Sequence, residues 1–174
     1  MKKTTLAALL AAPLAVLALG GMYHRGNKLT IEFPDGWSKP TTDKEGIITT
    51  KGPGGVLCNA QTNEPAGMKD LTLDQINSEF NHVFNAVDWG NIMSIDPANI
   101  AVSEGQKRPF GDAYYQIATL TLKPGTFGSN EVMMRFGAYV LPGRITMSGC
   151  YARSADFANW RPIFEQSVSS LRPW

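Results

Sequence analysis

The sequence is poor in the residues that most enzyme chemistry requires. Its 174 residues include only two cysteines and two histidines. The cysteines do not form a C-x-x-C redox motif, and neither histidine has a second one nearby with which to bind zinc. The sequence also lacks a nucleophile elbow, a Walker lysine and a paired-carboxylate motif. We therefore expect no catalytic residues, no metal and no cofactor, and a hydrolase is the third and last functional alternative.

Long apolar runs are also scarce, and the one that stands out lies at the N-terminus. Lys2 and Lys3 precede the apolar stretch Leu6–Leu19, a pattern typical of a secretory signal peptide. The stretch is shorter than the roughly 20 apolar residues that span a bilayer. We predict a signal peptide over residues 1–20 and a single exported domain over residues 21–174, periplasmic or secreted. An uncleaved anchor is the alternative, and would be the only contact with a membrane.

No charge of one sign dominates the chain. The 16 basic and 15 acidic residues become 14 and 15 once Lys2 and Lys3 are removed with the signal peptide, a formal charge of −1. Such a balance gives no electrostatic footprint for nucleic acid or an anionic membrane. The sequence therefore predicts no nucleic-acid partner.

The two cysteines are best explained by the predicted export. Exported chains meet oxidising conditions, where an even pair of cysteines usually cross-links. We therefore predict a disulfide between Cys58 and Cys150. A redox or nucleophilic role is the alternative, but a cysteine nucleophile needs a histidine to hold its thiolate.

The first half of the chain alternates short strands with one helix. Leu29, Ile31 and Phe33 alternate with polar residues as on a half-buried strand, and two more short strands flank the glycine-rich turn 51–55. A helical period follows, with a capping box of Thr72 and Gln75 at its start. The apolar side of this predicted helix consists of Leu73, Ile76, Phe80, Val83, Phe84 and Val87. His82 falls on the opposite, solvated side, and His24 lies in a segment expected to be frayed.

The second half is rich in strands. Four extended runs occupy 99–105, 112–122, 131–141 and 144–152, and the last three should form an antiparallel meander. A final helix carries an apolar stripe, but Pro162 fits poorly inside a helix. We therefore predict a loose turn over 155–160 and a regular helix that begins near Pro162. The stripe consists of Trp160, Phe164, Val168 and Leu171, which we expect to pack against the sheet.

This order of elements predicts an α+β domain with helices packed on an antiparallel sheet. The segments LTIEFPDGW, TLDQINSEF, RPFGDAYYQIAT, RFGAYVLPGRITMSGCYA and FANWRPIFEQSVSSLR resemble the Mog1/PsbP-like fold family, which includes bacterial envelope proteins related to DcrB. The resemblance implies an α/β/α sandwich around an antiparallel sheet of about six to seven strands, with two main helices. It also implies binding and assembly, and it carries over neither catalytic residues nor a particular partner.

Two functional hypotheses from different classes follow. The first is a non-catalytic exported module that binds another envelope or exported protein, as an assembly, stability or immunity factor. Its candidate partner surface consists of Trp37, Trp89, Phe127, Arg135 and Arg144, and core packing is the alternative for the tryptophans.

The second hypothesis is a carrier of a small ligand or lipid. Its cavity would lie between helix and sheet and would need several hundred cubic ångströms. The predicted lining consists of Met133, Met134, Phe136, Tyr139 and Met147.

Arginine is the last feature of note, because the C-terminal part uses it where the N-terminal part uses lysine. Arg135, Arg144, Arg153 and Arg161 could form a face that binds carboxylates or other anions, because guanidinium groups bind such groups bidentately. A solvated surface is the alternative. The sequence does not specify the oligomeric state.

Overall fold

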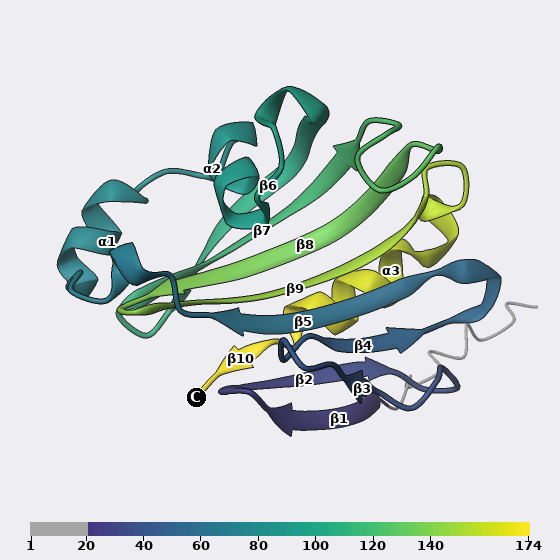
Figure 1. Cartoon of the computed structure of the whole chain (residues 1–174), viewed down its shortest axis with the longest axis horizontal. Helices are drawn as coiled ribbons and strands as arrows, with labels where there is room; N and C mark the ends of the chain where they lie inside the picture. Colours follow the sequence, from purple (N-terminus) through teal and green to yellow (C-terminus); the bar gives the residue numbers. More distant parts are fainter. Residues whose placement is uncertain (1–20) are drawn as a thin grey trace, which may run out of the picture.

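A seven-stranded antiparallel sheet forms the centre of the fold in a computed structural model that describes residues 21–174 (Figure 1). The predicted signal peptide lies outside the described residues. The strand order is β3-β4-β5-β9-β8-β7-β6, which confirms the predicted α+β class and antiparallel sheet. The strands are β3 (Thr41–Thr42), β4 (Ile48–Lys51), β5 (Leu57–Asn63), β6 (Ile100–Phe110), β7 (Ala113–Leu122), β8 (Val132–Leu141) and β9 (Arg144–Arg153).

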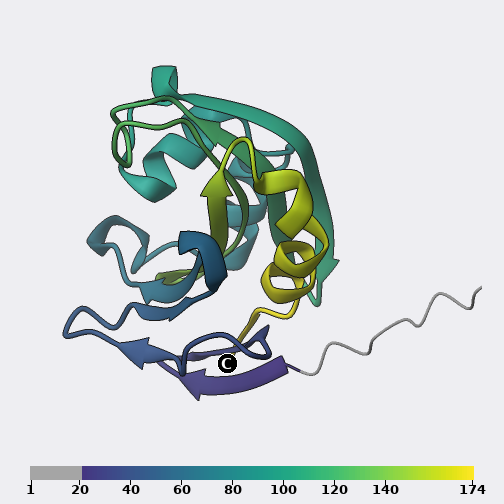
Figure 2. The ribbon, with the colours of Figure 1, turned by 90° about the vertical axis from the view of Figure 1, so that its right-hand side faces the viewer.

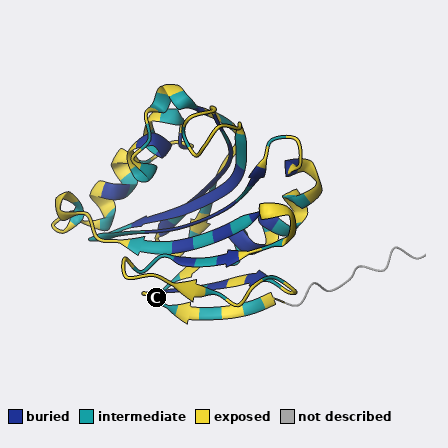
Figure 3. Ribbon diagram, turned by 45° about the vertical axis from the view of Figure 1, so that its right-hand side comes forward, coloured by how far each residue is buried: buried dark blue, intermediate teal, exposed yellow. Residues whose placement is uncertain are grey.

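The predicted meander is present as β7, β8 and β9. The turn at Pro142-Gly143 sets the register of β8 with β9, which pair from Leu141 with Arg144 onward. β6 adds to β7 on the other side, with a bulge where the register shifts between Ser103 and Gln106. Buried residues concentrate along these middle strands (Figure 3). The sheet is therefore covered on both faces, and two separate apolar cores lie against it.

Alternation along β9 shows how the two cores divide. Met147 and Tyr151 belong to the core on one face, whereas Cys150 and Ala152 belong to the core on the other. This is the alternation predicted from the sequence, because successive side chains of a strand point to opposite faces.

A second, three-stranded sheet packs below the first. It consists of β1 (Gly21–Gly26), β2 (Leu29–Pro34) and β10 (Arg172–Pro173), in the order β1-β2-β10. Leu29, Ile31 and Phe33 of β2 are all fully buried. His24 therefore lies in a strand paired with β2 and not in a frayed segment, because the predicted strand at 29–33 provides an edge with which β1 can pair.

The C-terminal helix α3 (Phe157–Ser169) packs between the two sheets, on one face of the large sheet (Figure 2). The prediction of a loose turn over 155–160 was wrong, since the helix begins at Phe157 and contains Pro162. Pro162 is exposed, so water can satisfy the carbonyl group that its missing N–H leaves free. The predicted stripe is confirmed, with Phe164, Val168 and Leu171 fully buried.

The opposite face is covered by two short helices where one was predicted. These are α1 (Leu73–Glu79) and α2 (Ala86–Met93), and the predicted continuous stripe was wrong because Val83 and Val87 are half exposed. The chain breaks because Asn85 starts a new helix with its own capping box. The capping box of Thr72 and Gln75 at α1 is confirmed. Single 3₁₀ turns occur at Pro53–Gly55, Ala66–Met68 and Pro97–Asn99.

Candidate functional site

The predicted disulfide joins β5 to β9 in the middle of the large sheet. Cys58 and Cys150 are bonded, and they are direct partners in the register of these two antiparallel strands. Both residues are buried in the core under α3. The bond is thus shielded from solvent, as expected for a structural disulfide.

A cleft of about 390 Å³ opens on the other face of the same strands. Its floor lies on β5, β9 and β8, and α2 covers only part of this face (Figure 2). Asn59, the residue after Cys58 on β5, lies on this floor, because neighbouring positions of a strand face opposite sides. The disulfide therefore fixes the two strands directly behind the cleft.

The β5 side of this floor is a row of amides, called the amide wall. Asn59, Gln61 and Asn63 occupy alternate positions of β5, so all three side chains face the cleft. The Gln61 side chain makes one weak contact, from Nε2 to the Met147 sulfur at 3.6 Å. Among residues 21–174, no hydrogen bond uses the side chain of Asn59 or Asn63. This wall therefore offers donors and acceptors that are largely unused.

The neighbouring part of the same floor is apolar and consists of Met134 and Phe136 of β8 with Met147 of β9, which pairs with Gln61; it is called the apolar wall. Gly149 makes this arrangement possible. A Cβ atom at position 149 would lie 2.5 Å from Cδ2 of Phe136 and 2.9 Å from Cε of Met134. The glycine therefore lets both side chains extend across β9 toward β5.

The mouth of the cleft is formed by the end of α2 and by the loop between β7 and β8. Met93 and Ser94 line it from α2, and Phe127 lines it from the loop. The ring of Phe127 stacks on that of Tyr151 with centroids 6.4 Å apart. Burial raises the pKa of the Tyr151 hydroxyl, so this group stays neutral at ordinary pH and can donate a hydrogen bond.

The structure divides the predicted ligand-binding residues between the two faces. Met134, Phe136 and Met147 line the cleft, as the carrier hypothesis expected. Met133 and Tyr139 belong instead to the core under α3, because they point to the opposite face of β8. The amide row was missed, although its polar residues at every second position of a predicted strand were a readable signal.

The predicted partner surface is not one surface. Trp89 is fully buried, with its ring against Phe136 at 5.4 Å, and Arg135 is 3% exposed. For Trp89, the alternative of core packing is confirmed, because its side chain belongs to the core on the α2 face. The place of Arg135 on a partner surface was wrong, because Arg135 is buried in a central strand. Trp37 is half-buried against Trp160, with ring centroids 5.8 Å apart.

The remaining two residues of that set lie on the outside of the molecule. Phe127 is 58% exposed at the mouth of the cleft. Arg144 is partly exposed and donates to the carbonyl oxygen of Trp174 at 2.9 Å.

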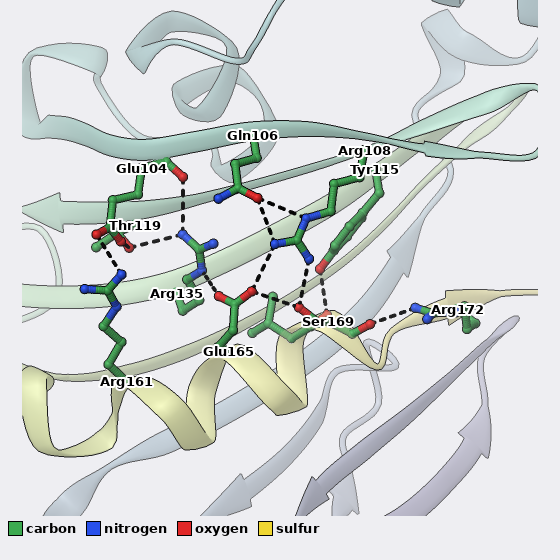
Figure 4. Close-up of polar contacts among 11 residues, drawn as sticks. Glu104, Gln106, Arg108, Tyr115, Thr119, Arg135, Arg161, Glu165, Ser169 and Arg172 are labelled. Atoms are coloured by element: carbon green, nitrogen blue, oxygen red, sulfur yellow. Dashed lines mark hydrogen bonds and ion pairs between the residues drawn. The ribbon is translucent and has the colours of Figure 1, made fainter.

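Two of the four C-terminal arginines converge, but on carboxylates of this chain (Figure 4). Arg135 Nε donates to Glu165 Oε2 at 2.5 Å, and Arg161 pairs with Glu104 at 2.7 Å. Arg108 from β6 also pairs with Glu165, at 3.2 Å. We call Glu104, Arg108, Arg135, Arg161 and Glu165 the arginine cluster. It connects α3 to β6 and β8, and Arg144 does not join it.

The charges of the arginine cluster determine the state of Glu165. Burial alone would raise the pKa of this carboxyl group. The hydrogen bond and charge of Arg135, with the hydrogen bonds from Arg108 and Ser169, outweigh burial and hold the pKa below its usual value. The cluster is therefore a charged structural bridge with its partners already in place.

The remaining features of residues 21–174 concern metal ions and membranes. This part of the chain contains no group of three or more histidine, cysteine, aspartate or glutamate side chains placed to hold a metal ion. Within the same range, the helices are too short or too polar to cross a bilayer.

Comparison with known proteins supports the fold alone. No protein-family model and no curated protein matches the sequence. The structure is similar to that of cyanobacterial PsbP from Synechocystis sp. PCC 6803, with a TM-score of 0.54 and 10% identity over 95% of this chain and 99% of that one. It is also similar to a Pseudomonas aeruginosa protein of unknown function, with a TM-score of 0.51 and 12% identity over 89% of this chain and 98% of that one. The predicted resemblance to the PsbP-like fold is thereby confirmed.

Proposed function

We propose that this protein is a non-catalytic exported binding protein that holds a small amphipathic molecule in the cleft over β5, β9 and β8. The observation that carries the proposal is the pairing of an amide wall with an apolar wall around about 390 Å³. Pockets that bind small molecules have volumes of roughly 300–1,000 Å³ and combine apolar lining with a few placed polar groups. The cleft has both properties.

The chemistry of the lining favours binding over catalysis. Its described residues include no histidine, no cysteine and no pair of carboxylates. General acid–base catalysis needs a positioned group with a pKa near the working pH. Tyr151, with its raised pKa, does not supply one.

Export is the second part of the proposal. The N-terminal sequence has the pattern of a signal peptide, and the chain forms a buried disulfide. Disulfides persist in oxidising compartments and are rare in the cytosol. Both observations support a periplasmic or secreted protein.

Native mass spectrometry of the protein purified from an exporting host tests this function. We expect a retained small molecule that is released on denaturation. Asn59→Trp should abolish retention because the indole would fill the cleft from its floor, whereas Thr41→Trp, on the exposed strand β3, should retain the molecule. If neither variant retains the molecule, or if both variants retain it equally, the proposed site is contradicted.

A protein partner is the second candidate function, and Phe127 is the observation that favours it. This side chain is 58% exposed beside the cleft. Exposed aromatics are typical anchors of protein interfaces. Cross-linking in envelope extract should capture a partner that is lost with Phe127→Ser and kept with Val87→Ser, a change at a similarly exposed site on α2.

A further inference from the structure

We infer that the cleft selects electrically neutral amphipathic ligands and rejects anionic ones of the same shape. The inference rests on the proposed function, that the cleft holds a small molecule. It goes further by stating the chemical class of that molecule.

The lining of the cleft carries almost no charge. Of the fifteen residues that line the cleft, Glu45 alone carries a charge, and no lysine or arginine is among them. Glu45 is exposed at the rim. The arginine cluster cannot serve the cleft, because Arg135 points to the α3 face of β8 while its neighbours Met134 and Phe136 point to the cleft.

Burying an anion in this cleft costs free energy. An ion that leaves water loses its solvation, and the loss is recovered only if a countercharge and hydrogen bonds replace it. The apolar wall supplies neither. The amide wall supplies hydrogen bonds but no positive charge, and the negative charge of Glu45 opposes an anion further.

The amide wall is well suited to bind neutral polar groups. Alternate residues of a strand are about 7 Å apart, so the three amides extend over about 13 Å. Each amide has both a donor and an acceptor side. Hydroxyl, amide or ether groups along one edge of a ligand can therefore bond to Asn59, Gln61 and Asn63 while its apolar face contacts Met134, Phe136 and Met147.

Two dyes with the same aromatic body provide the test. N-phenyl-1-naphthylamine is neutral, and 1-anilinonaphthalene-8-sulfonate is the same body with one negative charge. Titration of the folded protein, stripped of any retained molecule, should show fluorescence saturation with the neutral dye and at least tenfold weaker affinity for the sulfonate. Asn59→Trp should abolish binding of the neutral dye, and Thr41→Trp should leave it unchanged.

A charge placed inside the cleft gives the decisive comparison. Gln61→Arg should raise the affinity for the sulfonate by at least tenfold relative to that for the neutral dye. Gln61→Glu, its matched control, should not improve sulfonate binding. Near-ultraviolet circular dichroism verifies that each variant keeps native packing, since partly unfolded proteins also bind the sulfonate.

The outcomes separate the inference from the function on which it rests. If neither dye binds, or if Asn59→Trp binds both dyes as the wild type does, the proposed small-molecule site is wrong. If both dyes bind with equal affinity and Asn59→Trp abolishes both, the site stands and the selection against anions is wrong. If Gln61→Arg leaves the affinity for the sulfonate unchanged, the electrostatic explanation of the selection is also wrong.

Discussion

At the scale of single residues, Arg135 is the side chain that departs most from ordinary core chemistry. It lies in the central strand β8 and is 3% exposed, yet it carries a full charge. Besides Glu165, its guanidinium group donates to Thr119 Oγ1 at 3.2 Å and to the Glu104 carbonyl oxygen at 3.5 Å. These partners replace the water that Arg135 loses on folding.

Removing the carboxylate should therefore be costly. Glu165→Gln leaves the guanidinium group of Arg135 without its closest countercharge, and we expect the free energy of unfolding to fall by about 2 kcal/mol, less than for a fully buried pair because Glu165 is partly exposed. Urea unfolding measures it. The exposed pair of Lys28 with Glu64 is the control, because Glu64→Gln should leave the free energy of unfolding nearly unchanged. Equal losses in the two variants would show that the arginine cluster has no special role.

The same carboxyl group predicts how stability depends on pH. Because the pKa of Glu165 is lower in the folded state than in the unfolded chain, its contribution is fully present above the unfolded pKa of about 4.3. The contribution is lost as the pH falls through the folded pKa. Unfolding free energies measured from pH 7 down to pH 3 should therefore decline less steeply for Glu165→Gln than for the wild type. Parallel curves would contradict this assignment.

At the scale of elements, two tyrosines hold the C-terminal end of α3. Tyr115 of β7 donates its hydroxyl hydrogen to the carbonyl oxygen of Val168 at 2.6 Å, and Tyr139 of β8 donates to that of Leu171 at 3.0 Å. Their rings stack with centroids 4.5 Å apart. Val168 lies in the last turn of α3 and Leu171 follows the helix, so the two hydroxyls attach the end of α3 and the segment after it to the sheet.

Gly137 makes room for this arrangement, and its substitution should break it. A Cβ atom at position 137 would lie 2.0 Å from the hydroxyl oxygen of Tyr115. Gly137→Ala should therefore displace the ring, break its bond to Val168 and lower the unfolding free energy by about 3 kcal/mol. The control is Gly67→Ala, where no atom lies within 4 Å of the added methyl group. Thermal unfolding of both variants provides the comparison, and similar midpoints would refute the role of Gly137.

Local signals predicted the elements well where the deciding contacts are local. The capping box of Thr72 and Gln75 lies within four residues, and the sequence located it correctly. The break before α2 had a similar signal in Asn85 and Asp88, but the apolar period of the surrounding residues concealed it. β1 and β10 could not be predicted, because each is defined by its pairing with β2 and not by its own sequence.

At the scale of the whole molecule, the large sheet joins two parts of the chain that are distant in sequence. β3, β4 and β5 come from its first part, and β5 pairs with β9 from its end. The disulfide crosses this junction with a sequence separation of 92 residues. The apolar part of the cleft was found for this reason: Met134, Phe136 and Met147 lie within one meander, whereas the place of the amide wall beside them depends on the distant pairing of β5 with β9.

Loss of the disulfide should test how strongly the junction depends on it. Cys58→Ala with Cys150→Ala removes a constraint on a loop of about 90 residues, for which the chain-entropy relation gives about 4.6 kcal/mol. We expect a decrease of that order in the unfolding free energy, together with weaker binding of the neutral dye because β5 and β9 form the floor of the cleft. Reduction of the wild type under denaturing conditions, followed by refolding with a reductant, should reproduce both effects. Unchanged stability would show that backbone pairing alone holds the two parts together.

The position of β9 near the end of the chain also fixes when the cleft can first exist. A protein is synthesised from its N-terminus, so β5 is finished while its partner strand is still unmade. At about 5–20 residues per second, the 92 residues from Cys58 to Cys150 take roughly 5 to 20 seconds to follow. During that interval the Cys58 thiol has no native partner and the edge of β5 is open to other strands. The time before β9 follows is therefore when aggregation through the edge of β5 threatens this protein most, and a chaperone that covers this strand would have its greatest effect then.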